Sequence, residues 1–302
     1  MNTRSTAARL MIGATAALIA LSLTGCVDNA PTTTLPTATS TAKVAADDAV
    51  TALVPSEIAK SGTLNVGVNL TYSPNEFKKP DGSPTGWAIE LMDAITAKMG
   101  LTPTYHPAAF DNILPGVIGG KYDLGQGSFT DTHEREKVVD FVTYYSAGTR
   151  WAAKAGSTLD PENACGLVIA AGATTYQETN DLPARSAACV AAGKKPIEVL
   201  KLDTQDDITN SVVLGRAAGF AADSPVTAYA VAATKGKLEL VGDQYDSAPF
   251  GFAVAKDSGT LKKAVQAAVQ SLIDDGTYLN ILKTWGVEDG AVTTATINGA
   301  LF

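Results

Sequence analysis

The stretch GKYDLGQGSFTDTHEREKVVDF, residues 120–141, joins an apolar segment to a polar one and then to a charged one. Residues 122–126 are short and half apolar, which predicts a strand. Gly127, Ser128 and Thr130 follow and supply hydroxyl groups, free backbone amides and conformational freedom. We therefore expect a strand that leads into a polar loop.

A helix is predicted directly after this loop. Asp131 or Thr132 is a suitable N-cap, and Glu134 lies three residues after Asp131, as in a capping box. Arg135 then falls in the first turn of the helix. A guanidinium beside free amides at a helix N-terminus suits a carboxylate held by two parallel hydrogen bonds. The alternative is that Arg135 is solvated within the charged residues 134–137.

Outside this stretch, strand patterns alternate with helix patterns. Apolar residues alternate over residues 64–68, and apolar residues at helical spacing follow over residues 88–99. Further strands are expected at residues 167–170, 197–202 and 219–222, each followed by a helix. Such alternation predicts mainly parallel sheets, whose ligands bind at the carboxyl ends of the strands.

Composition and charge indicate a two-domain protein. The chain has 302 residues, of which 45% are hydrophobic and 18% are charged, and this is enough for two domains with their own cores. Its net charge of −8 argues against nucleic acid as a partner. Two histidines and the absence of a Cys-x-x-Cys pair argue against a metal site. We expect no cofactor.

The N-terminus predicts export and lipid attachment. Arg4 and Arg9 precede an apolar segment over residues 10–23 that is too short to span a bilayer comfortably, so residues 1–25 are expected to be a signal peptide. Leu23-Thr24-Gly25-Cys26 resembles the bacterial lipobox, which implies a lipid on Cys26. We expect an extracytoplasmic protein anchored to the outer face of the cell membrane by lipidated Cys26. The alternative is an ordinary signal peptide with a chance cysteine.

Two further features follow from this compartment. Residues 26–60 are expected to form a tether after the lipidated cysteine, because their central part is rich in Thr, Ala and Pro and has no apolar period. Cys165 and Cys189 are expected to form a disulfide in an oxidising exterior. Two buried free thiols are the alternative.

Several short motifs occur in an order that is found in a known protein family. These motifs are Gly62–Val68, Tyr72-Ser73-Pro74, Gly86-Trp87, Phe110–Val117, Gly120-Lys121-Tyr122-Asp123, Ser128, Thr130, Thr132-His133-Glu134-Arg135, Gly219–Asp223 and Ile281–Gly286. Together they resemble the extracytoplasmic amino-acid-binding proteins of ABC importers, bacterial solute-binding protein family 3. The resemblance extends over residues 61–302.

This resemblance implies an α/β protein with a two-lobed, periplasmic-binding-protein-like fold of type II. Each lobe is then a mainly parallel sheet flanked by helices, and two strands form a hinge. We expect residues 61–148 and 246–302 to form lobe 1 and residues 149–245 to form lobe 2.

The resemblance also assigns roles to individual residues. Arg135 is expected to bind the α-carboxylate of an amino acid, aided by Thr130 and by Thr174, with Thr175 as the alternative to Thr174. Asp223 is expected to accept the α-ammonium. The Ser128 carbonyl and the Thr130 hydroxyl complete this set of acceptors.

The ligand side chain is expected to lie near Tyr72 and Phe110. Asn69 stands where relatives that bind basic amino acids carry an acid, and Asn75 replaces a common aromatic residue. A polar or neutral side chain is therefore favoured over a cationic one.

The function implied is capture of a free amino acid or a related zwitterion by a monomeric binding protein that delivers it to an ABC permease. One alternative is a secreted dehydratase-like enzyme of the same fold, which needs a cleft acid for proton transfer. Besides Asp223 no such acid is apparent in the sequence. Another alternative is a ligand sensor that acts through a partner protein.

Overall fold

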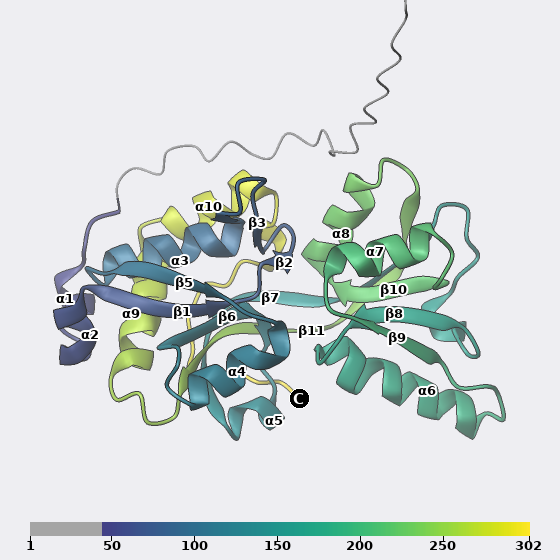
Figure 1. Cartoon of the computed structure of the whole chain (residues 1–302), viewed down its shortest axis with the longest axis horizontal. Helices are drawn as coiled ribbons and strands as arrows, with labels where there is room; N and C mark the ends of the chain where they lie inside the picture. Colours follow the sequence, from purple (N-terminus) through teal and green to yellow (C-terminus); the bar gives the residue numbers. More distant parts are fainter. Residues whose placement is uncertain (1–43) are drawn as a thin grey trace, which may run out of the picture. The chain divides into compact units, whose positions relative to one another are not determined.

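The structure is a computed structural model that describes residues 44–302. The expected signal peptide, Cys26 and much of the tether lie outside these residues. Two lobes share one eight-stranded sheet in the order β5-β1-β6-β11-β7-β10-β8-β9 (Figure 1). Within residues 44–302, no helix is long and apolar enough to cross a membrane.

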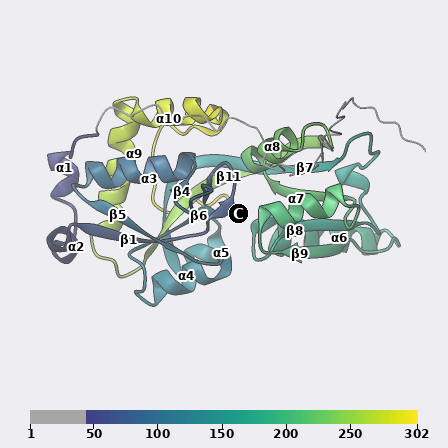
Figure 2. The same cartoon turned by 45° about the horizontal axis from the view of Figure 1, so that its top comes forward.

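Lobe 1 is built on three parallel strands, β1 (Thr63–Val68), β5 (Thr102–Pro107) and β6 (Leu124–Thr130). Its helices are α1 (Asp48–Thr51), α2 (Ser56–Ser61), α3 (Trp87–Lys98), α4 (Phe110–Ile118), α5 (His133–Glu136), α9 (Leu261–Asp274) and α10 (Thr277–Trp285). Helices α3 and α9 lie on one face of the sheet and α4 on the other (Figures 1 and 2). A small sheet of β2 (Thr71–Tyr72), β3 (Glu76–Lys78) and β4 (Pro84–Thr85) follows β1.

Lobe 2 repeats this arrangement with parallel strands in the order β10-β8-β9. These are β8 (Val168–Gly172), β9 (Glu198–Leu202) and β10 (Gly219–Asp223). Its helices are α6 (Leu182–Ala191), α7 (Gln205–Val213) and α8 (Ser224–Ala233), and a π-helical turn, η2 (Gln177–Asp181), precedes α6. Apolar side chains of α7 and α6 fill separate clusters, one around Phe220 and one around Trp151.

Two long strands, β7 (Val139–Lys154) and β11 (Leu238–Ala255), belong to both lobes. They pair antiparallel with each other. In addition, β11 pairs antiparallel with β6 in lobe 1, and β7 pairs antiparallel with β10 in lobe 2. The register of β7 and β11 shifts at three places: between Val241 and Tyr245, between Tyr245 and Ala248, and between Phe250 and Gly251. The sheet is therefore mixed where the lobes join and parallel within each lobe.

The structure differs from the sequence prediction at Gly127, Ser128 and Thr130. These residues continue strand β6 instead of forming a loop. Phe129 and Thr130 pair with Gly251 and Phe250 of β11, which is far away in sequence, so no local pattern indicates this pairing. Ser128 adopts a positive φ of 52°, which marks the irregular end of the strand.

The C-terminal residues 296–302 form a strap over lobe 1 that the sequence did not predict. Ile297 bridges Val142 of β7, and Gly299 donates a backbone hydrogen bond to Asp131 Oδ2 at 2.7 Å. The His133 amide donates to the Phe302 carbonyl at 3.0 Å, which ties the strap to α5.

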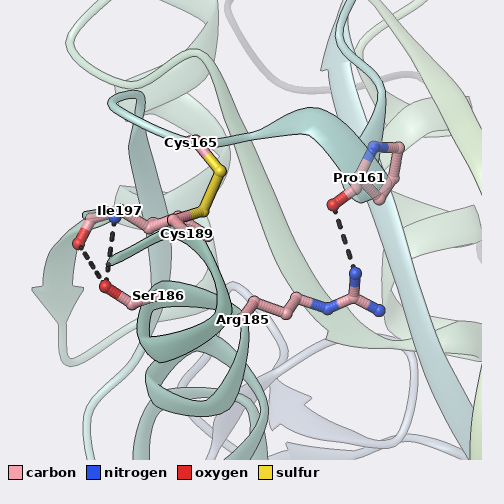
Figure 3. The surroundings of a disulfide bond; sticks show 6 residues. All are labelled: Pro161, Cys165, Arg185, Ser186, Cys189 and Ile197. Carbon is pink, nitrogen blue, oxygen red and sulfur yellow. Dashed lines mark hydrogen bonds between the residues drawn. A yellow bond between two sulfur atoms is a disulfide. The ribbon is translucent and has the colours of Figure 1, made fainter. Parts of the chain in front are cut away.

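Lobe 2 contains the expected disulfide between Cys165 and Cys189 (Figure 3). It joins the loop before β8 to α6 and closes a loop with a sequence separation of 24 residues. Ser186 of the same helix receives a hydrogen bond from the Ile197 amide at 3.1 Å. The disulfide and this bond hold α6 against the segments that precede β8 and β9, at the amino ends of these strands.

We predict that Cys165→Ser combined with Cys189→Ser lowers the free energy of unfolding by up to about 3.5 kcal/mol, because the reduced loop gains conformational entropy in the unfolded chain. Urea denaturation of wild type and variant, with and without reductant, measures this difference. Reductant should bring the wild type to the stability of the variant. Equal stability of the two oxidised proteins would contradict the prediction.

Candidate functional site

The carboxyl ends of β6, β8 and β10 meet at one cavity between the lobes. The space in it that no atom fills is about 480 Å³, including the part open to solvent, and residues of both lobes line it. Lobe 1 contributes the end of β6, α5 and the β1–β2 connection, and lobe 2 contributes the residues after β8, β9 and β10. This is where the parallel strands of each lobe predict a ligand site.

Arg135 projects into the cavity from the short helix α5. The hydroxyl of Thr132 caps this helix by accepting a hydrogen bond from the Arg135 amide at 3.3 Å. The guanidinium donates to the Thr130 carbonyl at 2.9 Å and to the Thr174 carbonyl of lobe 2 at 3.0 Å. Burial lowers the pKa of Arg135 to about 10, so the side chain remains charged at neutral pH.

The guanidinium also lies against an aromatic wall. Its central carbon is 5.8 Å from the ring centre of Phe110 and 5.6 Å from that of Phe129. These two rings stack on each other at 4.4 Å. Arg135 is thereby fixed in position and orientation.

Asp223 ends β10 on the opposite side of the cavity and is 6% exposed. The Tyr72 hydroxyl donates to Asp223 Oδ2 at 2.7 Å, and Gln177 Nε2 donates to Oδ1 at 3.0 Å. Because Tyr72 belongs to lobe 1, this hydrogen bond connects the lobes directly. Burial raises the pKa of Asp223 to about 6, against the opposing effect of these two donors.

The residues after β8 form the lobe 2 wall below Arg135. Gly172, Ala173, Thr175, Tyr176 and Gln177 line the cavity. Thr174 is not among the lining residues and contacts Arg135 only through its carbonyl, whereas the alternative, Thr175, lines the cavity.

Ser128 and Thr130 line the cavity from lobe 1. Asn75 does not line the cavity and is fully buried behind it, where it donates to the Ser128 hydroxyl at 2.9 Å and accepts from the Trp87 indole at 2.7 Å. The Ser128 hydroxyl in turn donates to Glu76 Oε2 at 3.1 Å. Burial raises the pKa of Glu76 well above its usual range. Asn75 therefore orients the wall residue Ser128.

Asn69, Tyr72 and Phe110 also line the cavity, as the sequence predicts for residues near a ligand. The Asn69 carbonyl oxygen accepts a hydrogen bond from the Thr71 hydroxyl at 2.8 Å, and its amide donates to the Ala108 carbonyl at 3.3 Å. Its polar atoms are thus already bonded within the protein.

Sequence analysis missed four polar or aromatic residues of lobe 2 that line the cavity: Tyr176, Gln177, Asp203 and Gln205. Asp203 and Gln205 follow the carboxyl end of β9, and Tyr176 and Gln177 follow that of β8. The position of Asp203 just after a predicted parallel strand was the signal that could have identified it.

A pair of carboxyl groups lies behind α5. Asp131 is fully buried, and burial raises its pKa to about 7, helped by the negative charge of Glu136. The amides of Gly299 and Ala300 in the C-terminal strap donate to Asp131 and Glu136. Within residues 44–302, no group of His, Cys, Asp and Glu side chains could hold a metal ion.

Comparisons with known proteins agree with the fold and with a binding site. An arginine-binding protein of Corynebacterium glutamicum, ArgT, is 43% identical over 251 residues, which cover 82% of this chain and 82% of that protein. An ancestral arginine-binding protein bound to arginine has a TM-score of 0.67 and 30% identity, covering 74% of this chain and 98% of that one.

A second structure, of an ancestral arginine-binding protein bound to glutamine, has the same TM-score and identity and covers 75% of this chain and 99% of that one. The model of the bacterial extracellular solute-binding proteins, family 3, matches residues 64–288. These relatives are binding proteins rather than enzymes. The chain therefore belongs to the bacterial extracellular solute-binding proteins, family 3, and it is an amino-acid-binding protein of the two-lobed α/β type.

Proposed function

We propose that this protein is anchored outside the cell by a lipid on Cys26, captures an amino acid between its lobes and delivers it to an ABC permease. The observation that carries the proposal is the presence of Arg135 and Asp223, from different lobes, in the lining of one cavity. An α-amino acid presents a carboxylate and an ammonium on one carbon. Each of these groups thus finds a buried residue of opposite charge.

The carboxylate site is supported by the setting of Arg135. The guanidinium is held by two backbone carbonyls and an aromatic wall, so its remaining donors are fixed before a ligand arrives. A planar guanidinium binds a carboxylate through two parallel hydrogen bonds. The Thr130 hydroxyl and the residues Thr174 or Thr175 are proposed to assist.

The ammonium site is supported by the setting of Asp223. Its two oxygens accept hydrogen bonds from Tyr72 and Gln177, and an ammonium that enters replaces or shares these donors. The Ser128 carbonyl and the Thr130 hydroxyl are proposed as further acceptors. A zwitterion bound in this way links the lobes. It stabilises the closed arrangement by as much as it binds that arrangement more tightly than the open one.

The class of side chain is open to two proposals. Asn69 in the cavity wall carries no charge, which favours a polar, neutral side chain over a cationic one. The relatives named above favour a cationic one, because they are named as arginine-binding proteins, although one structure contains glutamine.

We predict that arginine or glutamine raises the melting temperature of the wild-type protein and of neither Arg135→Ala nor Asp223→Ala. A ligand that binds only the folded state stabilises it, and each variant lacks one of the two charges that hold the zwitterion. A thermal-shift screen over the standard amino acids measures the effect. His133→Ala, an exposed change in the same helix, is the control and should respond as the wild type does. Unchanged shifts in both variants would refute the assigned site.

A second prediction concerns pH. Asp223 must be ionised to accept an ammonium, and its pKa of about 6 lies just below neutrality. We therefore expect a similar affinity at pH 7 and pH 8 and a decrease below pH 6 that approaches about tenfold per pH unit. Calorimetric titration measures this profile. Because Asp131 titrates near pH 7, Asp131→Asn serves as a control and should keep the decrease below pH 6. An affinity that stays constant from pH 7 to pH 5 would contradict the role of Asp223.

The lipid anchor gives a third prediction. Cys26→Ser removes the sulfur that is proposed to carry the lipid, and a single unlipidated tether does not hold a protein on a membrane. The variant should leave the membrane fraction and lose labelling by a radioactive fatty acid, while its response to amino acids is retained. A variant that remains in the membrane fraction without label would point to an anchor other than Cys26.

A further inference from the structure

The lobe 2 wall carries a carboxylate that the binding of a simple zwitterion does not use. Asp203 follows β9, lines the cavity and is exposed. Among residues 44–302 it forms no ion pair, because the nearby Lys201 is bonded to Glu178 at 2.5 Å. The side chain of Asp203 is therefore available to a ligand.

Gln205 adds a second acceptor beside Asp203. It lines the same cavity and is only 4% exposed. Its amide nitrogen donates to Thr209 at 3.3 Å, while its carbonyl oxygen Oε1 is buried and has no hydrogen-bond partner in the described part of the chain. A buried acceptor without a partner is costly, so a ligand that donates to it is favoured.

The local charges support a cation at this position. The N-terminus of α7 carries a partial positive charge of about half a unit, which disfavours a cation. Asp206 and Asp207 lie in the first turn of that helix and Asp203 lies just before it, so three acidic side chains oppose the helix dipole. The carboxylates outweigh the helix dipole, and the corner is electronegative.

The distance between the two acid positions matches a long side chain. Strands β10, β8 and β9 are neighbours in that order, and Asp223 and Asp203 follow the outer two (Figures 1 and 2). Strands lie about 4.8 Å apart, so the two backbones are separated by about 10 Å. The unbranched stem of arginine or lysine places its two cationic groups far enough apart to meet both acids.

A count of charges leads to the same conclusion. The cavity lining contains the carboxylates of Asp203 and Asp223 and the guanidinium of Arg135. The α-carboxylate and α-ammonium of a ligand neutralise Arg135 and Asp223. One carboxylate, that of Asp203, then remains unless the ligand brings a second cation.

We propose that Asp203 and Gln205 bind a cationic side chain, so that the ligand is an amino acid with a guanidinium or ammonium at the end of a long unbranched stem. This inference rests on the proposed function. The aromatic rings of Tyr72, Phe110 and Tyr176 supply the faces along which such a stem and a guanidinium pack.

The test compares arginine with citrulline, which has the same length and shape but a neutral urea group. Calorimetric titration of the full-length chain in detergent should give at least tenfold tighter binding of arginine. Asp203→Asn should weaken the binding of arginine by about 10- to 100-fold and leave the affinity for citrulline nearly unchanged. The reason is that only the charged guanidinium loses a partner of opposite charge. The affinity for lysine should fall in Asp203→Asn as that for arginine does, and the affinity for glutamine should be nearly unchanged, as that for citrulline is.

Glu198→Gln is the matched control. It removes the same charge from the exposed, opposite end of β9 and should keep the ratio of the arginine and citrulline affinities. The inference would be overturned if the wild type bound arginine and citrulline with equal affinity, or if it bound glutamine more tightly than arginine. It would also be overturned if Asp203→Asn left the ratio of the arginine and citrulline affinities unchanged. If Arg135→Ala still abolishes binding in that case, the proposed function stands without it. If no amino acid binds the wild type, both fail.

Discussion

The antiparallel pairing of β7 with β11 is the constraint on which both lobes depend. These two strands are the central pair of the sheet, and each lobe is completed on one side of them. Near Tyr245, where the two strands pass between the lobes, two shifts of register interrupt their pairing. There Gly148 approaches Tyr245 so closely that a Cβ atom would lie 2.6 Å from the Tyr245 carbonyl oxygen. The absence of a side chain at Gly148 therefore lets β7 and β11 run close together at this point.

Local patterns were sufficient for the elements that position the charged residues. The helix that carries Arg135 depends only on neighbouring residues, and the structure has it with Thr132, one of the two predicted caps, at its N-terminus. The capping box predicted between Asp131 and Glu134 is therefore wrong, since Asp131 is not the cap. The resemblance to the family singled out Asp223 at the end of its strand, whereas its position before Ser224-Pro225 by itself predicts only a helix cap. The alternation of strands and helices predicted the parallel sheet of each lobe, and the family comparison confirms the two-lobed fold.

Features that depend on distant segments were not predictable in the same way. Ser128 belongs to a strand only because β11 pairs with the end of β6, and Asn75 is buried because the Trp87 indole and Ser128 lie on either side of it. The sequence of the C-terminal strap has no strong apolar periodicity. The strap is held instead by single hydrogen bonds to the α5 region and to β7, which no local pattern predicts. Asp203 resembles an ordinary helix-flanking acid until the order of β10, β8 and β9 is known.

The hydrogen bond between Tyr72 and Asp223 has a consequence for how such a protein changes over evolutionary time. The hydroxyl of Tyr72 in lobe 1 donates to the carboxylate that we propose as the acceptor of the ligand's ammonium, so this bond competes with every amino acid equally. Substitutions that strengthen or weaken this bond while leaving the Tyr72 ring in place are expected to shift all affinities together and to leave their ranking unchanged. Residues on the β9 side of the cavity alter the ranking instead. The overall affinity for amino acids and the choice among them can therefore change independently under selection.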